Sequence, residues 1–323
     1  MKEISFSRAQ TEAFDEEMAR DPTVFIMGED IGKYWAGPMG QFRGLFAKYG
    51  PQRIRETPIS ETAFMGGAIG AAATGMRPIA AMMFVDFLGV CFDELLNQLQ
   101  MRYMYGGKIK LPLTILASTG AGASAAAQHS KSIHGLLMSV KGLKIVTPST
   151  AYDAKGLLKS AIREDNPVIF LTHKLLGRTS SQVPDEEYLI PLGKADIKRE
   201  GSDVTVVAAA FMVHHALATA TKLQEKGISV EVVDPRTLVP LDKQAIIDSV
   251  KKTGRLVIMS EEPRTGSWAS GISAIVAEEA FDYLDAPIKI ICAPDTPIPF
   301  SPVLEKFWIP GEEDLLKAIT EIV

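Results

Sequence analysis

The chain has 323 residues, of which 46% are hydrophobic, 23% are charged and 7% are aromatic. Its 34 Lys and Arg are outnumbered by 39 Asp and Glu, which gives a formal net charge of −5 and no basic surface for nucleic acid. Disordered, collagen-like and disulfide-stapled classes are excluded by this composition. The length predicts a large core divided between about two domains.

Thiol, targeting and membrane signals are weak in this sequence. The two cysteines, Cys91 and Cys292, lie far apart, which indicates reduced, buried thiols. The first twenty residues hold five acidic residues and no apolar block of a secretory signal, so we expect a cytoplasmic protein. The most apolar stretch, 63–85, is interrupted by Arg77 and Pro78, and no membrane role is expected.

Short β-branched runs alternate with longer segments rich in Ala and Leu through the first half of the chain. This pattern predicts buried parallel strands that alternate with helices in an α/β domain, which we place at 1–180. Strands are expected at 23–27, 78–83, 113–117, 143–147 and 167–172. Helices are expected at 63–75, 91–105 and 152–164.

A polar segment with two prolines follows, and we place a linker at 181–191. After it the alternation restarts, which predicts a second, smaller α/β domain at 192–323. Its strands are expected at 203–210, 228–234, 255–260 and 287–293, and its helices at 212–225, 243–253 and 267–283. We interpret the proline-rich tail as an ordered segment that wraps around the domain.

Several common catalytic motifs are absent. Gly120, Gly122 and Ala125 fit the loose dinucleotide-binding pattern, but no acid for a ribose follows in 140–150, which disfavours a nicotinamide site. The sequence has no Walker phosphate loop, no G-x-S-x-G and no H-E-x-x-H.

Among the histidines, His129 is the strongest candidate for a functional group. It follows a loop of Gly, Ala and Ser residues that comes directly after an internal strand, where parallel sheets present ligand-facing groups. The adjacent His214 and His215 are interpreted as surface residues, and His173, at the end of a strand, fits a structural role at least as well as a place near a site.

Glu61 stands at the start of an apolar, glycine-rich helix. A carboxylate there could simply interact with the helix dipole, which is worth about 0.3 to 1 kcal/mol. Gly66 and Gly70, however, each cost roughly 1 kcal/mol relative to Ala inside a helix, so their face must pack closely against another element.

The segment from Glu61 to Ala71 matches the pyrimidine-side signature of thiamine-diphosphate enzymes, E-x4-G-apolar-x-x-G-apolar, except that Gly67 fills the first apolar position. On this and the following motifs the chain resembles, over essentially its full length, the β subunits of thiamine-diphosphate-dependent 2-oxo acid and acetoin dehydrogenases, a transketolase-like family. The motifs are G-E-D-I-G-K at 28–33, M-R-P-I at 76–79, F-V-D-F-L-G-V-C-F-D at 84–93, A-A-Q-H-S at 126–130, P-S-T-A-Y-D-A-K-G-L-L at 148–158 and D-P-R-T-L-V-P-L-D at 234–242.

The resemblance implies a pyrimidine-binding domain followed by a transketolase C-terminal-like domain. It implies that Glu61 hydrogen-bonds the pyrimidine ring of the coenzyme, that Phe87 stacks on this ring and that Ile59 lies at its edge. His129 would face the substrate or the lipoyl group. The implied enzyme cleaves acetoin or oxidatively decarboxylates a 2-oxo acid, and transfers the acyl group to lipoamide.

The resemblance also implies metal ions and partners. A structural potassium ion would be held mainly by backbone oxygens of Leu113, Ala161, Ile162, Glu164 and Asn166. The family holds the diphosphate and Mg²⁺ with a Gly-Asp-Gly motif that this chain lacks. We therefore expect a separate α subunit to bind Mg²⁺, in an α2β2 heterotetramer that works with a lipoyl acyltransferase core.

Besides Gly67, three positions depart from the family pattern, namely Ala81, Leu116 and Lys131. The residue patterns of segments 272–281 and 296–305 resemble acetoin-cleaving members of the family, which favours acetoin over pyruvate or branched-chain substrates. Two alternatives stay open at this point: a transketolase-like carboligase that does not use lipoamide, and a non-catalytic scaffold for an α partner.

Overall fold

The computed structural model describes all residues from Met1 to Val323, which form two compact units. The first unit comprises Met1–Thr119 and Ser139–Leu192, and the second comprises Gly120–Met138 and Gly193–Val323. The excursion from Gly120 to Met138 therefore belongs to the second unit, although it interrupts the first unit in the sequence.

A parallel sheet is the centre of the first unit, with the strand order β6-β7-β5-β4-β2-β3. Its strands are β2 (Val24–Gly28), β3 (Ile54–Glu56), β4 (Arg77–Phe84), β5 (Thr114–Thr119), β6 (Lys144–Val146) and β7 (Val168–His173). Two further strands, β1 (Lys2–Ser5) and β8 (Ser180–Val183), form an antiparallel ribbon. The parallel β-sheet predicted for this half of the chain is confirmed.

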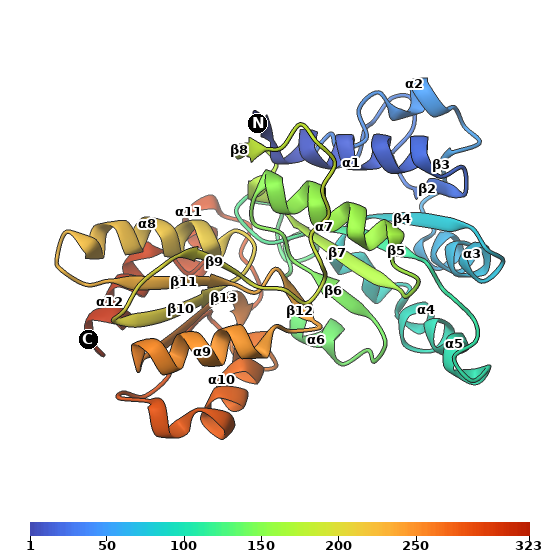
Figure 1. Cartoon of the computed structure of the whole chain (residues 1–323). Coiled ribbons are helices and arrows are strands. Elements are labelled where there is room, and N and C mark those ends of the chain that lie inside the picture. The colour runs from blue at the N-terminus through green and yellow to red at the C-terminus, as the bar shows by residue number, and fades with distance from the viewer. The chain divides into compact units, whose positions relative to one another are not determined.

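Helices cover this sheet, and Figure 1 shows α1 and α7 side by side. The α-helices of the unit are α1 (Phe6–Arg20), α2 (Leu45–Tyr49), α3 (Glu61–Ala73), α4 (Phe92–Leu96), α5 (Met101–Met104) and α7 (Ala151–Arg163), and the 3₁₀ turns are η1 (Val85–Gly89), η2 (Gln98–Gln100) and η3 (Lys174–Leu176). Alternate strand residues such as Ile26, Ile79 and Phe170 share one core cluster with Phe14 of α1 and Leu158 of α7. Helix α3 packs against β4 and β2.

The single helix predicted at 91–105 is wrong, because the chain there forms α4, η2 and α5 in succession. The side-chain amide of Asn97 donates to the carboxylate of Asp93 at 2.6 Å, and that of Gln98 donates to the same carboxylate at 3.2 Å. The backbone N–H of Asn97 also donates to the Asp93 carbonyl at 2.8 Å, so α4 is closed by a helical hydrogen bond at Asn97 before the chain continues as η2.

The residues expected as a linker are packed against the first unit. The ring of Tyr188 stacks on Tyr152 at 4.7 Å, and its hydroxyl donates to the Tyr152 carbonyl at 2.8 Å. Ile190 is part of the core cluster. The second unit resumes at Gly193.

The second unit contains a sheet with the order β14-β13-β10-β11-β9, in which only β9 is antiparallel to its neighbour. The strands of this sheet are β9 (Asp196–Arg199), β10 (Val204–Ala208), β11 (Val230–Asp234), β13 (Leu256–Pro263) and β14 (Lys289–Ala293), and the short strand β12 (Thr237–Val239) of the same unit lies outside it. Its helices are α6 (His134–Met138), α8 (Met212–Gln224), α9 (Lys243–Thr253), α10 (Trp268–Glu279), η4 (Phe281–Tyr283), α11 (Pro302–Trp308) and α12 (Glu312–Thr320). None of the helices in the chain is both long and apolar enough to cross a bilayer.

Ion pairs join α1 to α7. The ammonium groups of Lys155 and Lys159, both 2% exposed, lie 2.6 Å from the two carboxylate oxygens of Glu16. Lys155 also pairs with Glu12, whereas the only other acid near Lys159 is the exposed Glu187 at 3.6 Å. Glu16 is therefore the main counter-charge of a buried cation.

We expect Glu16→Gln to lower the free energy of unfolding by about 2 kcal/mol, because a buried ammonium then loses its charged acceptor. Urea denaturation of the variant and of the wild type measures this difference. The matched control is Glu3→Gln in the exposed part of β1, which should change stability by less than about 0.5 kcal/mol. Equal stabilities of the Glu16 and Glu3 variants would show that the pairs contribute nothing.

Candidate functional site

Three sequence segments that carry polar or aromatic groups follow the carboxyl ends of adjacent strands in the first unit. Glu29 comes directly after β2, Glu61 follows β3 through a short connection, and Phe87 lies in η1 directly after β4. The strands lie in the order β4-β2-β3, so these segments meet at one edge of the sheet. In open α/β sheets ligands bind outside this edge.

Glu61 is the first residue of α3, and its side chain is only 7% exposed. The preceding Ser60 makes no side-chain cap, so the carboxylate itself is the acidic group in the first turn of the helix. Farther along α3, a methyl group added at Gly66 or Gly70 would meet no atom within 4 Å. The close packing expected at these glycines therefore does not come from within this chain.

Glu29 lies beside Glu61, and this neighbour was not predicted from the sequence. Its side chain is 6% exposed, its carboxylate accepts from the backbone N–H of Ser60, and its Oε1 has no hydrogen-bond partner. Burial, together with the nearby charge of Glu61, raises the pKa of Glu29 to about 7. Two buried carboxyl groups thus lie at one site, and one of them keeps its proton up to neutral pH.

The backbone around these two carboxyl groups is held closely. The N–H of Thr57 donates to the Gly28 carbonyl at 2.9 Å, which fixes the segment that leads to Ser60 and Glu61. A side chain at Gly28 would place its Cβ 2.3 Å from the Ala81 carbonyl oxygen of β4. The acid after a glycine at the end of a buried strand is the sequence signal that could have identified Glu29.

Phe87 and Ile59 are the two apolar residues expected to contact the coenzyme ring. The Thr62 hydroxyl in α3 donates to the Val90 carbonyl at 3.1 Å, which joins the start of α3 to the end of the segment that carries Phe87. The ring of Phe87 is half-buried and meets Phe84 edge-on at 6.0 Å. Ile59 is 82% exposed, as expected for an apolar residue that contacts something outside the isolated chain.

His129 belongs to the second unit, in the segment that precedes α6. Its side chain is half-buried, and its backbone N–H donates to the Ala126 carbonyl at 3.4 Å. The two ends of the loop are closed by a hydrogen bond from the Gly120 N–H to the Lys131 carbonyl at 3.1 Å. The loop is therefore closed at its base by a backbone hydrogen bond.

Backbone oxygens expected to hold potassium lie near the end of α7 and the start of β5. The guanidinium of Arg77 donates to the carbonyls of Ile162 and Glu164 at 3.1 and 3.0 Å. The Leu113 carbonyl accepts from Val168, and the Ala161 carbonyl accepts from Glu164. Since a carbonyl oxygen has two lone pairs, each keeps capacity for a second, cationic partner.

The remaining histidines named above and the two cysteines do not form a second centre. His214 and His215 pack against Phe211, and the Nδ1 of His173 accepts from the backbone of Leu175. Both cysteines are free, and burial raises the pKa of Cys91 to about 12. No group of three His, Cys, Asp or Glu side chains is arranged to hold a metal ion.

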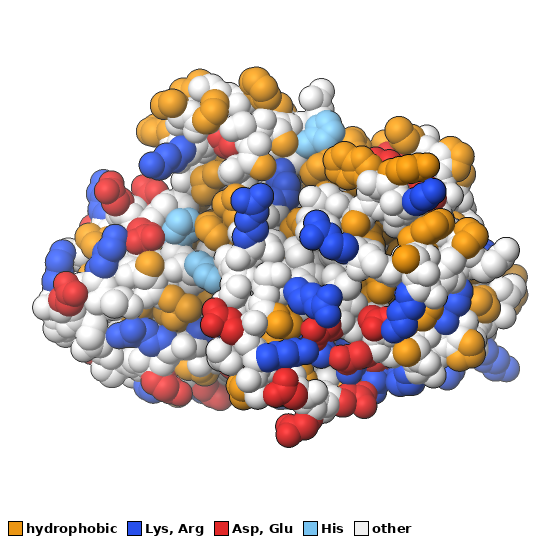
Figure 2. Space-filling view, turned by 90° about the horizontal axis from the view of Figure 1, so that it is seen from above, with side chains coloured by type: hydrophobic (Ala, Val, Ile, Leu, Met, Phe, Trp, Pro, Cys, Tyr) orange, Lys and Arg blue, Asp and Glu red, His pale blue; other side chains and the backbone are white.

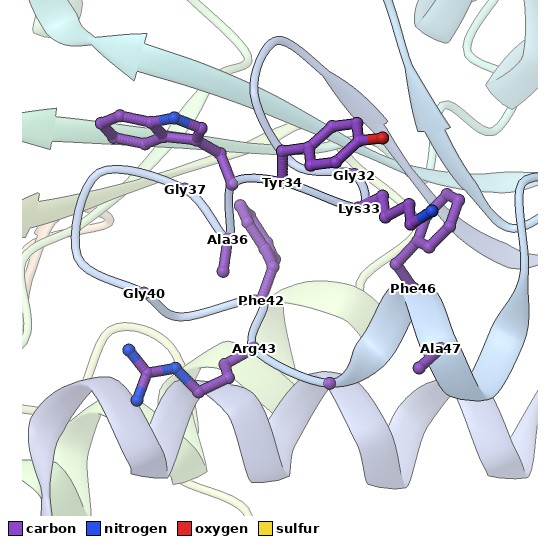
Figure 3. A pocket seen from close by; sticks show the side chains of 12 residues that line it. Gly32, Lys33, Tyr34, Ala36, Gly37, Gly40, Phe42, Arg43, Phe46 and Ala47 are labelled. Carbon is purple, nitrogen blue, oxygen red and sulfur yellow. The ribbon is translucent and has the colours of Figure 1, made fainter.

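A cavity of about 470 Å³ lies in the loop that follows Glu29, between residues 32 and 47. Tyr34 and Trp35 in its wall are 84% and 58% exposed. Figure 3 shows Phe42 on the inner side of this loop, while Arg43 extends away from Phe46. This open aromatic wall is a further surface of the first unit that its own chain leaves uncovered.

Comparison with known proteins gives matches over both units. Residues 2–179 match the transketolase pyrimidine-binding domain, and residues 193–315 match the transketolase C-terminal domain. The acetoin:2,6-dichlorophenolindophenol oxidoreductase subunit beta of Bacillus subtilis is 48% identical over 99% of this chain and 97% of its own length. The pyruvate dehydrogenase E1 component subunit beta of Rickettsia felis is 44% identical over 99% of this chain and 98% of its own.

A solved structure, titled a split gene transketolase in an inactive β4 tetramer, has the same fold. Its TM-score is 0.80 at 24% sequence identity, and the match covers 99% of this chain and 98% of that one.

The Glu29 carboxyl group makes stability depend on pH. Its pKa rises from 4.5 to about 7 on folding, so the folded state binds more protons than the unfolded state between these values. The contribution of Glu29 to the free energy of unfolding therefore falls as the pH rises from about 4.5 to about 7. We expect Glu29→Gln to become more stable relative to the wild type as the pH rises over this range, as measured by urea denaturation at pH 5, 6, 7 and 8. A difference between the two proteins that does not change with pH would contradict the raised pKa.

Proposed function

The chain belongs to the transketolase-like family of β subunits of thiamine-diphosphate-dependent acetoin and 2-oxo acid dehydrogenases. From this membership we propose that it supplies the pyrimidine half of the coenzyme site. The complete enzyme would cleave acetoin and transfer the acetyl group to lipoamide. One observation carries the proposal: the buried carboxyl group of Glu61 lies at the ligand-binding edge of the sheet, beside an orphaned oxygen of Glu29.

The residues at this edge fit the aminopyrimidine end of thiamine diphosphate. A buried carboxyl group is suited to a hydrogen bond with a ring nitrogen, and an aromatic ring is suited to stack on a flat heterocycle. When bound, the coenzyme supplies the carbanion chemistry of the reaction. The protein binds and orients the ring, excludes water and holds the proton.

Each residue has a distinct task in this proposal. Glu61 holds a hydrogen bond to the pyrimidine ring, Phe87 supports one face of the ring and Ile59 covers its edge. Glu29 keeps its proton up to neutral pH, because its environment is apolar and Glu61 is close. Because the protonated Glu29 is neutral, it adds no second negative charge next to Glu61.

His129 is the proposed group on the substrate side. An imidazole can hold or give up a proton near neutral pH, which suits the oxygen of acetoin or an incoming lipoyl group. The position of His129 supports this role, because it lies in a loop of small residues that is closed by a hydrogen bond between Gly120 and Lys131.

Acetoin is the favoured substrate. The identity to the acetoin-oxidising β subunit is 48%, against 44% for the pyruvate dehydrogenase β subunit, over nearly equal lengths. Turnover of acetoin, pyruvate and branched-chain 2-oxo acids with 2,6-dichlorophenolindophenol as electron acceptor tests this choice. Acetyl transfer to an added lipoylated protein distinguishes the dehydrogenase from a carboligase.

The partner is an α subunit that holds the diphosphate and Mg²⁺, in an α2β2 assembly that docks on a lipoyl acyltransferase core. The uncovered glycine face of α3 and the exposed side chains of Ile59, Tyr34 and Trp35 support a partner over the first unit. Hydrophobic side chains also gather in groups on the face seen in Figure 2. Two unpaired cysteines support a place in the reducing cytoplasm.

We expect Glu61→Gln to lower kcat for acetoin at least 100-fold in the complex with the α subunit, since an amide cannot share a proton with the ring as a carboxyl group does. Initial rates with the artificial electron acceptor measure this loss. The control is Glu186→Gln, at an exposed carboxylate in the first unit, which should keep full activity. Unchanged turnover in the Glu61 variant would favour the scaffold alternative.

A potassium ion at Leu113, Ala161, Ile162, Glu164 and Asn166 is the remaining part of the proposal. Replacing NaCl by KCl at equal ionic strength should raise the thermal midpoint of the chain by about 2 to 4 °C, which corresponds to about 1 kcal/mol. Scanning calorimetry measures the shift, with choline chloride as the reference salt. Equal midpoints in the three salts would show that these carbonyls need no ion beyond the N–H groups of Arg77 and of the backbone that already bond them.

A further inference from the structure

Three buried carboxylates of the second unit face the backbone of the loop that carries His129. Glu261 and Glu262 lie in β13 and are 5% and 4% exposed, and Glu305 lies in α11 and is 2% exposed. None of the three was singled out by the sequence. All three accept hydrogen bonds from backbone N–H groups in Gly120–Met138.

Glu305 holds the outer part of the loop. Its Oε1 accepts from the N–H of Gly122 at 2.9 Å, and its Oε2 accepts from the N–H of Ser124 at 2.8 Å. The hydroxyl of Ser124 donates to the same Oε2 at 3.3 Å. A single side chain from α11 thus fixes two alternate residues of the loop.

Glu261 joins the beginning of the loop to its end. Its Oε1 accepts from the N–H of Ala121 at 2.6 Å and from the hydroxyl of Ser132 at 3.3 Å. Glu262, the next residue of β13, bonds the chain beyond Ser132, where its Oε1 accepts from the N–H of Gly135 at 3.0 Å. The segments on both sides of His129 are therefore anchored to β13.

The loop needs such anchors because its backbone is unfavourable. Gly120, Gly122, Ser124 and Ala126 alternate along the chain with positive φ values of 93°, 99°, 51° and 58°. Ser124 and Ala126 carry a Cβ, and such conformations cost about 1 to 3 kcal/mol each unless the surroundings fix them. Alternating backbone of this kind turns its N–H groups to one side, where they form a concavity for an anion.

The anion in this concavity is the protein's own carboxylate. Gly122 and Ala123 are exposed, so Glu305 does not simply fill a core beneath them. Packing of α11 is maintained separately, because Trp308 lies in an apolar cluster with Ala121 and Ile298, and its indole N–H donates to the Thr296 carbonyl. The carboxylate of Glu305 thus bonds the loop, while Trp308 supplies the apolar packing of α11.

We propose that Glu305 is a positioning residue for His129: with Glu261 it holds the loop 120–132 in the strained form that directs the imidazole to the substrate. This inference rests on the role proposed for His129. It adds that a residue 176 positions farther along the chain sets the geometry of that histidine.

The test uses Glu305→Gln in the complex with the α subunit. The amide has about the same size but offers one acceptor oxygen and turns a donor toward an N–H group of the loop. We expect kcat for acetoin to fall about 10- to 100-fold, as for a reacting group displaced by about 1 Å, while the dissociation constant of thiamine diphosphate changes less than 2-fold. Glu305→Asp, which keeps the charge, should retain more activity than Glu305→Gln, and Glu313→Gln at an exposed carboxylate of α12 should match the wild type.

Two further measurements separate positioning from a general loss of structure. In a His129→Ala background, Glu305→Gln should cost less than 2-fold in kcat, because the group that it positions is gone. Hydrogen exchange of the complex should show at least a 10-fold loss of protection at the amides of Gly122 and Ser124 in Glu305→Gln, with β10 and β11 unchanged. The proposal would be overturned if Glu305→Gln lowered kcat by the same factor in the His129→Ala background as in the wild type. Unchanged protection at these two amides would also overturn it.

The exchange measurement does not depend on turnover. If the wild-type complex had no thiamine-diphosphate-dependent activity, the proposed function would fail, whereas the protection of Gly122 and Ser124 would still decide whether Glu305 fixes the loop. Lost protection with unchanged kcat would also overturn the proposal, since the loop geometry would then not matter to the reaction.

Discussion

The close approach of two carboxyl groups at the carboxyl edge of one parallel sheet is the interaction on which this account depends. The register of β2 between β4 and β3 creates it, because Gly28 lies against Ala81 and leaves no room for a side chain. The hydrogen bond from the Thr57 N–H to the Gly28 carbonyl holds the end of β2 beside the segment that leads to α3, and so holds Glu29 near Glu61. Burial then makes the ionisation of one acid unfavourable while the other is charged.

Carboxylates serve two opposite purposes in the two units. In the first unit a carboxyl oxygen of Glu29 accepts no hydrogen bond from the chain, so it can accept one from a ligand. In the second unit the oxygens of Glu305 and Glu261 are satisfied by backbone N–H groups and make a strained loop rigid. An unsatisfied oxygen suits the binding of a ligand, whereas satisfied oxygens suit the fixing of a loop.

Much of this could be predicted from local sequence. The strands of the first unit follow from β-branched runs, and Glu61 stands out as an acid that begins a glycine-rich helix. The pairing of Glu29 with Glu61 could not be predicted, because it depends on which strands are neighbours and not on spacing along the chain. For the same reason, the sequence did not indicate that the loop around His129 belongs to the second unit or that Glu305 holds it. The break in the helix expected at 91–105 has no signal in the sequence either, because this segment contains no proline or glycine.

The most direct test of the central claim is an electron-cryomicroscopy map of the complex formed by this chain, the α subunit, Mg²⁺ and thiamine diphosphate. The account predicts that a carboxylate oxygen of Glu61 lies within about 3 Å of a nitrogen of the pyrimidine ring, a normal hydrogen-bond distance, with Glu29 behind it. A bound coenzyme whose ring lies out of reach of Glu61, or a Glu61 that is covered only by protein in the complex, would contradict it.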